Sequence, residues 1–236
     1  NRFLQFQQEE QVVNNANGTL SIPPEFETQK DRLEAIARGF EQAPTSFEDC
    51  IQWACLKFQE LFSSNIRQLL FNFPKDSITS SGTPFWSGPK RAPSPIDFDC
   101  GNAMHLDFVW AAANLRSFIY SIKRSCERSD LSGICEKVEL PPFTPKSGIK
   151  IAANESEAAA TANSTASSPV GDELQGLIDR IKKSFSSTSI TSAVQVHEFE
   201  KDDDSNFHID FVAACANLRA TNYEITPTDR HHVKGI

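Results

Sequence analysis

The sequence predicts an α+β fold that is predominantly α-helical. Three observations support this class: long segments with apolar residues at helical spacing, a repeated segment that consists of an extended phrase followed by a helix, and one loop rich in glycine, proline and aromatic residues. With 236 residues, the chain is long enough to bury a substantial core as one large domain or two small ones.

The N-terminal part is predicted to contain two helical regions. Residues 1–28 are rich in Gln, Glu and Asn, a composition typical of loosely packed segments. Over Gln29–Glu41 the apolar residues recur at helical spacing, which predicts an amphipathic helix. Ser46 and Asp49 then resemble a capping box with aspartate in place of glutamate. The broad apolar face that follows continues to Pro74 and predicts one long helix or two consecutive helices.

The run Thr79–Asp99 is predicted to be a shaped loop. It combines four prolines and two glycines with the large rings of Phe85 and Trp86. Proline fixes φ, glycine opens backbone angles closed to other residues, and a flexible tether would lack the aromatic rings. We therefore expect a loop docked on the core, with Trp86 largely buried against the helical region Phe47–Phe73. The basic pair Lys90–Arg91 is either a recognition element or a solvated rim.

An internal repeat lies at an offset of 103 residues, because His105–Tyr120 and His208–Tyr223 are identical at ten of sixteen positions. Both copies carry an apolar stripe whose alanines permit close contact between helices. Each copy follows an extended phrase, Ile96–Asp99 and Val196–Phe199 respectively. The sequence therefore predicts two similar strand-to-helix units.

The residues between the two copies differ in composition from the rest of the chain. Asn154–Gly171 is rich in Ala, Ser, Thr and Asn and has almost no large apolar residue, which predicts a mobile insertion at about residues 152–171. Asp172–Phe185 then places acidic residues first and lysines last along an apolar stripe, as the helix dipole favours. We expect a short amphipathic helix there.

Composition and charge exclude several classes of partner. The net charge is −8 and the basic clusters are no longer than pairs, so no nucleic acid partner is expected. We see no secretory leader and no apolar run long enough to cross a bilayer, and expect no membrane partner. The six cysteines lack the spacing of a disulfide scaffold or a zinc site, which predicts no metal and a reducing compartment, the cytoplasm or the nucleus. The missing initiator Met and the abrupt end suggest an excised fragment.

No cysteine in the chain is predicted to be a catalytic nucleophile. Cys50 and Cys55 lie on the apolar face of a predicted helix, where burial would raise the pKa of a thiol. Cys215 occupies an alanine position of the repeat, which indicates packing. Cys126 and Cys135 flank a polar loop and could be exposed, but neither has a neighbouring histidine or a basic helix start.

The repeated His-X-Asp pairs admit a metal or acid/base interpretation. Residues two apart on a helix point in roughly opposite directions, so His105 and Asp107, like His208 and Asp210, are more consistent with hydrogen-bonded helix starts. The acidic run Glu198–Asp204 lacks the pattern of a calcium loop. No glycine-rich nucleotide loop follows a strand, so no cofactor site is expected within the chain.

Several long strings resemble a known family. SSNIRQLLFNFPKDSITSSGTPFWSGPKRAPSPIDFD, PPFTPKSGIKI and FEKDDDSNFHIDFVAACANLRATNYEITPTDRH are similar to ubiquitin-activating enzymes, in the half-domain that carries the second catalytic cysteine. The similarity begins at about Phe47 and is interrupted between Ile151 and Val196. It implies a helical second catalytic-cysteine half-domain over residues 1–225 that lacks its cysteine segment, with 226–236 starting the return to the adenylation domain.

The resemblance also implies a function for the parent enzyme. It would adenylate the ubiquitin C-terminus with Mg-ATP, form a cysteine thioester and pass ubiquitin to conjugating enzymes. Its partners would be ubiquitin, ubiquitin-conjugating enzymes and the adenylation domain of the same polypeptide. The family's cysteine lies in a Pro-X-Cys-Thr-type phrase that is absent here, so the thioester cysteine is expected upstream of Asn1 and the fragment alone is predicted inactive. The alternative is a non-enzymatic helical protein-interaction module derived from this domain.

One residue is a candidate neighbour of the thioester site. In the family, the short turn before the first repeat helix lies near the catalytic cysteine, and here that turn is Cys100-Gly101-Asn102. Asn102 either donates its side-chain amide to a thioester oxyanion or only caps the helix. The pair Ala103-Met104 departs from the family's more polar residues at this point.

Overall fold

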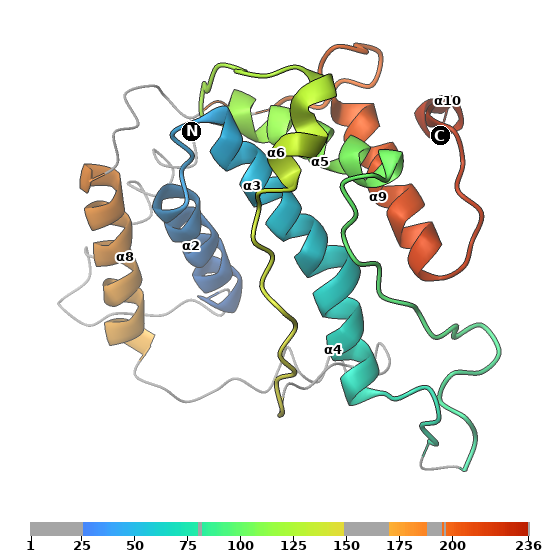
Figure 1. Cartoon of the computed structure of the whole chain (residues 1–236). Helices are drawn as coiled ribbons and strands as arrows, with labels where there is room; N and C mark the ends of the chain where they lie inside the picture. Colours follow the sequence, from blue (N-terminus) through green and yellow to red (C-terminus); the bar gives the residue numbers. More distant parts are fainter. Residues whose placement is uncertain (1–25, 80–81, 149–169, 188–194, 196, 236) are drawn as a thin grey trace. The chain divides into compact units, whose positions relative to one another are not determined.

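The computed structural model describes residues 26–79, 82–148, 170–187, 195 and 197–235. The described residues fall into two units, one that contains α2 and α8 and one that contains all the other elements (Figure 1). Both units are built mainly from helices, which confirms the predominantly helical class. No helix among these residues is long and apolar enough to cross a membrane.

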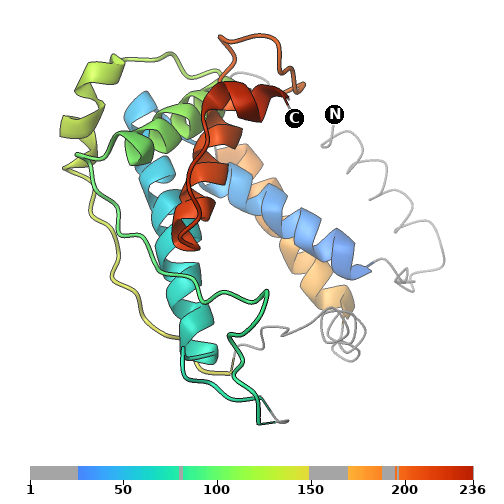
Figure 2. The ribbon, with the colours of Figure 1, turned by 90° about the vertical axis from the view of Figure 1, so that its right-hand side faces the viewer.

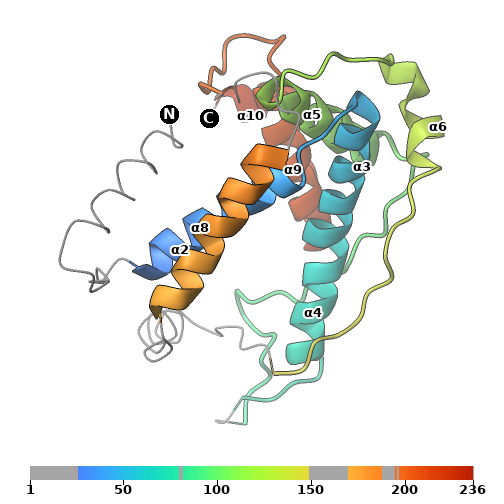
Figure 3. The ribbon, with the colours of Figure 1, turned by 90° about the vertical axis from the view of Figure 1, so that its left-hand side faces the viewer.

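The first unit is a pair of helices, α2 (Phe26–Glu41) and α8 (Val170–Ser187). They lie side by side in Figures 1 and 3, and they bury five apolar side chains between them: Leu33, Ala37, Leu177, Ile178 and Ile181. The Arg180 guanidinium joins the Glu41 carboxylate at 3.0 Å. Both predicted amphipathic helices are confirmed. The predicted mobile insertion lies outside the described residues, except that Val170 and Gly171 already belong to α8.

The second unit begins with a continuous rod of three helical segments. These are α3 (Phe47–Phe58), the π-helix η1 (Gln59–Ser64) and α4 (Asn65–Asn72). The remaining elements are α5 (Ala103–Ile119), the 3-10 turn η2 (Arg128–Asp130), α6 (Leu131–Cys135), α9 (His208–Asn222) and α10 (Arg230–Gly235). The rod confirms the long apolar face that the sequence predicts between the capping box and Pro74.

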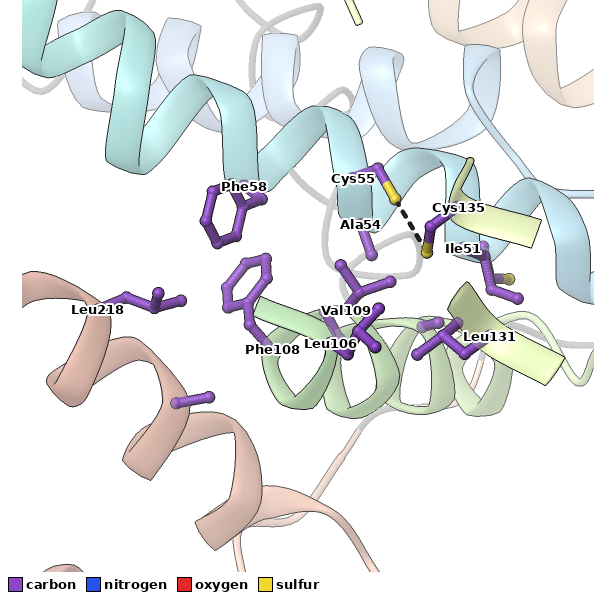
Figure 4. Packing of buried hydrophobic residues seen from close by; sticks show 14 of the residues in the cluster. Ile51, Ala54, Cys55, Phe58, Leu106, Phe108, Val109, Leu131, Cys135 and Leu218 are labelled. Carbon is purple, nitrogen blue, oxygen red and sulfur yellow. Dashed lines mark hydrogen bonds between the residues drawn. The ribbon is translucent and has the colours of Figure 1, made fainter. Parts of the chain in front are cut away.

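The core of the second unit lies where α3, α5, α6 and α9 meet, as Figure 4 shows. Phe58 of α3 faces Phe108 of α5 with ring centroids 5.8 Å apart, and Leu218 of α9 packs on the same cluster. Leu131 and Cys135 close the cluster from α6, and both are buried. Burial of this apolar surface is the main force that holds the four helices together.

The π-helical turn has a structural role in this unit. A π turn follows an i→i+5 hydrogen-bond pattern and frees backbone groups that a regular helix would use. Here the Phe62 carbonyl accepts the Ile96 N–H at 2.9 Å and the Asn222 side-chain amide at 3.0 Å. The Leu61 carbonyl accepts the Arg219 guanidinium at 3.2 Å. The rod is thereby tied to the segment before α5 and to the end of α9.

The expected β-component is not confirmed. Ile96–Asp99 and the described residues 197–199 precede their helices in non-helical conformations, but neither segment forms a strand. The described residues contain a single isolated β-bridge, between Ile78 and Pro84. A strand needs a neighbouring strand with which to form a ladder, whereas the Ile96 N–H is already used by the Phe62 carbonyl. The domain is therefore mainly helical, and its two repeat units pair a non-helical segment with a helix.

The loop before α5 is docked as predicted, but its tryptophan is less buried than expected. The Trp86 indole N–H donates to the Phe73 carbonyl at 3.0 Å and to the Pro74 carbonyl at 3.1 Å. The Phe85 ring stacks on Phe73 with centroids 4.4 Å apart. The loop extends past the end of α4 (Figure 2), and Trp86 is half-buried there, not largely buried.

The segment between Cys126 and Cys135, expected to be a polar loop, is largely helical. Asp130 accepts the Glu127 N–H at 3.1 Å and starts η2, which leads into α6. Leu131 and Cys135 are one helical turn apart and face the core, so Cys135 is buried and not exposed. Ser132 and Gly133, poor helix formers, obscured this spacing in the sequence.

Candidate functional site

The turn at the start of α5 is held by the side chain of Asn102. Its Oδ1 accepts the Met104 N–H at 2.9 Å and the His105 N–H at 3.4 Å, which makes Asn102 the N-cap of the helix. The Ser132 hydroxyl donates to the Cys100 carbonyl at 2.8 Å and fixes the turn against α6. Asn102 is exposed, and its Nδ2 donates no hydrogen bond to any other described residue.

A histidine in the first turn of each repeat helix binds the backbone before that helix. His105 Nδ1 accepts the Asp99 N–H at 3.0 Å, and His208 Nδ1 accepts the Glu200 N–H at 3.1 Å. Burial lowers the pKa of His105, which favours the neutral ring whose Nδ1 accepts this hydrogen bond. Both histidines are hydrogen-bonded helix starts, which confirms that interpretation of the His-X-Asp pairs.

The aspartates of the same pairs point to arginines from later elements. Asp107 pairs with Arg128 at 2.8 Å, and Asp210 pairs with Arg230 at 2.7 Å. In each repeat, the histidine therefore fixes the segment before the helix, while the aspartate fixes an element that follows it. In each His-X-Asp pair, the two side chains therefore bind different parts of the chain and do not converge on a common ion.

The second repeat adds a histidine that the sequence analysis missed. His197 Nδ1 lies 3.0 Å from His208 Nε2, and His197 Nε2 lies 2.9 Å from the Leu115 carbonyl. Because the Leu115 carbonyl can only accept, a neutral His197 carries its proton on Nε2, and its Nδ1 then accepts from Nε2 of His208. His197 in turn donates to Leu115 in α5. No local pattern around His197 indicates this contact, which joins residues 82 positions apart.

A cavity of about 420 Å³ lies between α5 and α9. Its apolar wall includes Met104 and Trp110 of α5, and ion pairs line its rim. Arg230 joins Asp204 at 3.0 Å, and Lys234 joins the same carboxylate at 3.0 Å. The hydrogen bonds from Lys234 and Arg230 lower the pKa of Asp204, so this carboxylate is an ionised partner of cations and a weak proton acceptor.

The six cysteines are buried or half-buried. Burial raises the pKa of Cys50 to about 11 and that of Cys215 to about 11, and it also raises the pKa of Cys126. The Cys55 thiol lies 3.6 Å from Cys135 in the core, and this contact, followed by burial, raises the pKa of Cys55 (Figure 4). Cys50, Cys55 and Cys215 are packing residues, as the sequence predicts.

Among the described residues, no group of three or more His, Cys, Asp or Glu side chains is placed to hold a metal ion. The two histidine-bound helix starts and the ion-paired cavity between them instead define a helical scaffold.

Comparison with known proteins identifies the scaffold. Residues 1–234 match the family described as ubiquitin-activating enzyme, SCCH domain, and the chain belongs to this family. It is 46% identical over 234 residues to ubiquitin-activating enzyme E1 1 of Schizosaccharomyces pombe, covering 96% of this chain and 23% of that protein.

Two further relatives carry a similar name. Ubiquitin-like modifier-activating enzyme 1 of Dictyostelium discoideum is 44% identical over 95% of this chain, which covers 23% of that protein. The human protein of the same name is 44% identical over 86% of this chain, which covers 19% of its length. The chain therefore spans about a fifth to a quarter of these relatives.

Proposed function

We propose that this chain is the part of a ubiquitin-activating enzyme that supports thioester formation on a cysteine upstream of Asn1. The enzyme would form ubiquitin adenylate with Mg-ATP in an adenylation domain of the same polypeptide, to which residues 226–236 lead. It would then pass the thioester-bound ubiquitin to conjugating enzymes in the cytoplasm and nucleus. The family match over residues 1–234 is the observation that carries this proposal.

This chain would position groups around the thioester and would not supply the nucleophile. The thiols with raised pKa values are poor nucleophiles, whereas the start of α5 is fixed from several sides. His105 holds the backbone of Asp99, and Ser132 holds the carbonyl of Cys100. A rigid turn of this kind can hold a donor at a constant place beside a neighbouring thioester. The two repeat units, similar in these contacts, are proposed to derive from one duplicated segment.

Asn102 is the residue we assign to this donor role. Its Oδ1 is engaged by the Met104 and His105 N–H groups, and this cap fixes the plane of the amide. The Nδ2 group on the other side of the amide is then left to donate to an oxyanion that forms during transfer. The cap and donor roles are therefore compatible, because they use different atoms of one side chain.

The experiment compares Asn102→Asp with Asn102→Ala in the full-length enzyme. Aspartate keeps an oxygen for the cap but has no amide donor, whereas alanine loses both. If Nδ2 stabilises the oxyanion, both variants form the ubiquitin thioester about a hundredfold to a thousandfold more slowly. Pyrophosphate exchange, which reports adenylate formation, should be unchanged. Thioester is measured by non-reducing electrophoresis.

A cap-only role would give a different result. Asn102→Asp would then form thioester at the normal rate, and only Asn102→Ala would lose stability, by about 1 kcal/mol. Loss of pyrophosphate exchange in both variants would place the defect in the adenylation step and contradict the assignment.

A further inference from the structure

The loop between α4 and α5 forms part of a second concave surface. The residues that line this surface are not among those assigned to thioester formation. Its base is fixed: Phe85 stacks on Phe73 with centroids 4.4 Å apart, and the Phe85 N–H donates to the Ser77 carbonyl at 2.8 Å. Trp86 adds its indole hydrogen bond to the Phe73 carbonyl at 3.0 Å. The backbone of this loop is therefore pre-organised.

The end of α9 forms the opposite wall. Asn222 donates from Nδ2 to the Ser94 carbonyl at 2.8 Å, and the Asn222 carbonyl accepts the Ser94 N–H at 2.7 Å. These two hydrogen bonds fix the position of the loop relative to the residues that follow α9. Between them lies a hollow of about 580 Å³ whose rings are Trp86 and Tyr223. We call it the basic hollow.

The charge of the hollow is opposite to that of the chain. Lys75, Lys90 and Arg91 line it and are exposed, and Glu224 is its single carboxylate, so the lining carries a net charge of +2 (three cations minus one anion). The whole chain carries −8. Within the described ranges, Lys75 and Arg91 form no ion pair. The Lys90 ammonium lies 4.7 Å from the Phe85 ring centroid.

Cations gathered in a concave surface of an otherwise acidic protein attract anions selectively. A site for a free phosphate would need convergent, fixed donors, such as successive backbone N–H groups or a helix N-terminus. The cations here stand on long, exposed stems around an open hollow, which suits several carboxylates spaced along a chain. The two rings add surface on which the rest of a peptide can pack.

We propose that the basic hollow binds an acidic segment of a partner protein, whose carboxylates pair with Lys75, Lys90 and Arg91. This role goes beyond the proposed thioester function and depends on different residues. It resolves the open interpretation of the Lys90–Arg91 pair in favour of recognition.

The test measures binding of a short fluorescein-labelled polyglutamate peptide to the 236-residue chain by fluorescence anisotropy. Binding should saturate and should weaken as salt rises, because exposed ion pairs are screened. The double variant Lys75→Glu/Arg91→Glu should weaken binding about tenfold or more. The matched control Lys123→Glu/Lys137→Glu changes the net charge equally at exposed lysines outside the hollow and should bind like the unmodified chain.

Each alternative outcome is decisive. Equal weakening in both double variants would show that peptide binding reflects overall charge, and absence of saturable binding at low salt would also overturn the proposal. Displacement of the peptide by inorganic phosphate or ATP at lower concentration than by unlabelled polyglutamate would identify a small-anion site instead. Circular dichroism checks folding, and Lys75→Gln/Arg91→Gln, which removes charge without reversing it, should give a smaller loss of affinity in the same direction.

Discussion

Asn222 illustrates how one polar side chain can organise several segments. It is fully buried at the end of α9, and its Nδ2 donates to the carbonyls of Phe62 and Ser94 at 3.0 and 2.8 Å. Its Oδ1 accepts from Arg219 at 3.2 Å. A buried amide that satisfies partners on the rod, on the loop and on its own helix fixes their relative positions, because each broken bond leaves a desolvated group.

We therefore expect Asn222→Ala to lower the free energy of unfolding by about 2–3 kcal/mol, since it removes donors from two carbonyls and leaves a small cavity. Urea denaturation of the chain measures this loss. Asn217→Ala on the same helix is the control, because Asn217 is only half-buried and bonds to the backbone of Thr228. If Asn222→Ala lowers the free energy of unfolding no more than Asn217→Ala does, the hydrogen bonds of Asn222 do not hold these segments together.

Stability should also depend on the protonation of His105. Burial places the pKa of folded His105 below its usual value of 6.5, so the unfolded chain binds a proton at a pH where the folded chain does not. The contribution of neutral His105 to the free energy of unfolding is complete above pH 6.5. It is lost progressively as the pH falls toward the pKa of His105 in the folded chain. The pKa of the Asp97 carboxylate is lowered from 3.8, chiefly by its hydrogen bond with Arg67.

The measurement is urea denaturation at a series of pH values for the unmodified chain and for His105→Asn, which keeps an acceptor but does not titrate. The unmodified chain should lose more stability than the variant as the pH falls below 6.5. Parallel pH profiles for the two proteins would show that His105 does not contribute.

At the scale of the element, α3 shows how a local signal can start a helix on which the core depends. Asp49 accepts the Ser46 N–H at 2.9 Å, and Ser46 Oγ accepts the Asp49 N–H at 3.1 Å, which completes the predicted capping box. Thr45 adds a hydroxyl hydrogen bond to the same carboxylate at 2.7 Å. These bonds satisfy donors that the first turn of any helix leaves open.

Ser46→Ala should therefore destabilise the chain by about 1 kcal/mol, because it removes one of the two reciprocal bonds of the box. Ser46→Asn, which restores an acceptor at the N-cap, should recover most of this loss. Thermal and urea unfolding followed by circular dichroism report both variants. Equal stability of the alanine and asparagine variants would show that the side-chain cap is unimportant.

The elements also show where periodicity is informative. The apolar spacing predicted α2 and α8, whose buried residues recur at helical spacing, and also α5 and α9, whose buried residues are spread around most of the helix. It did not reveal η1, since a π turn changes the hydrogen-bond pattern without changing which residues are apolar. It also missed α6, whose single buried turn is too short to produce a periodic signal.

At the scale of the whole molecule, the prediction that no thiol of this chain forms the thioester rests on the burial of its cysteines. Three of its six cysteines are buried, and the other three are half-buried. A thioester also requires a prior acyl-adenylate, which the proposed function assigns to another domain.

The isolated chain should therefore give no DTT-sensitive adduct when incubated with ubiquitin and Mg-ATP. The full-length enzyme, treated identically, is the positive control, and non-reducing electrophoresis is the readout. A reducible ubiquitin adduct on the isolated chain would contradict the placement of the thioester cysteine outside it. The same result would require one of the half-buried cysteines, such as Cys100, to become accessible.

The sequence by itself determined the helical character, the repeat, the capping box and the family, because these depend on local spacing or on long matching strings. The tertiary structure decided which distant groups meet. It placed Cys135 against Cys55, His197 against His208, and Lys75 beside Arg91. The segments that were expected to be strands are not strands in the structure. Their backbone groups instead form hydrogen bonds with side chains and with the π turn. Local pattern indicates which face of a segment is apolar, whereas these contacts depend on how the folded chain packs, as for Cys55 and Cys135, which are 80 residues apart.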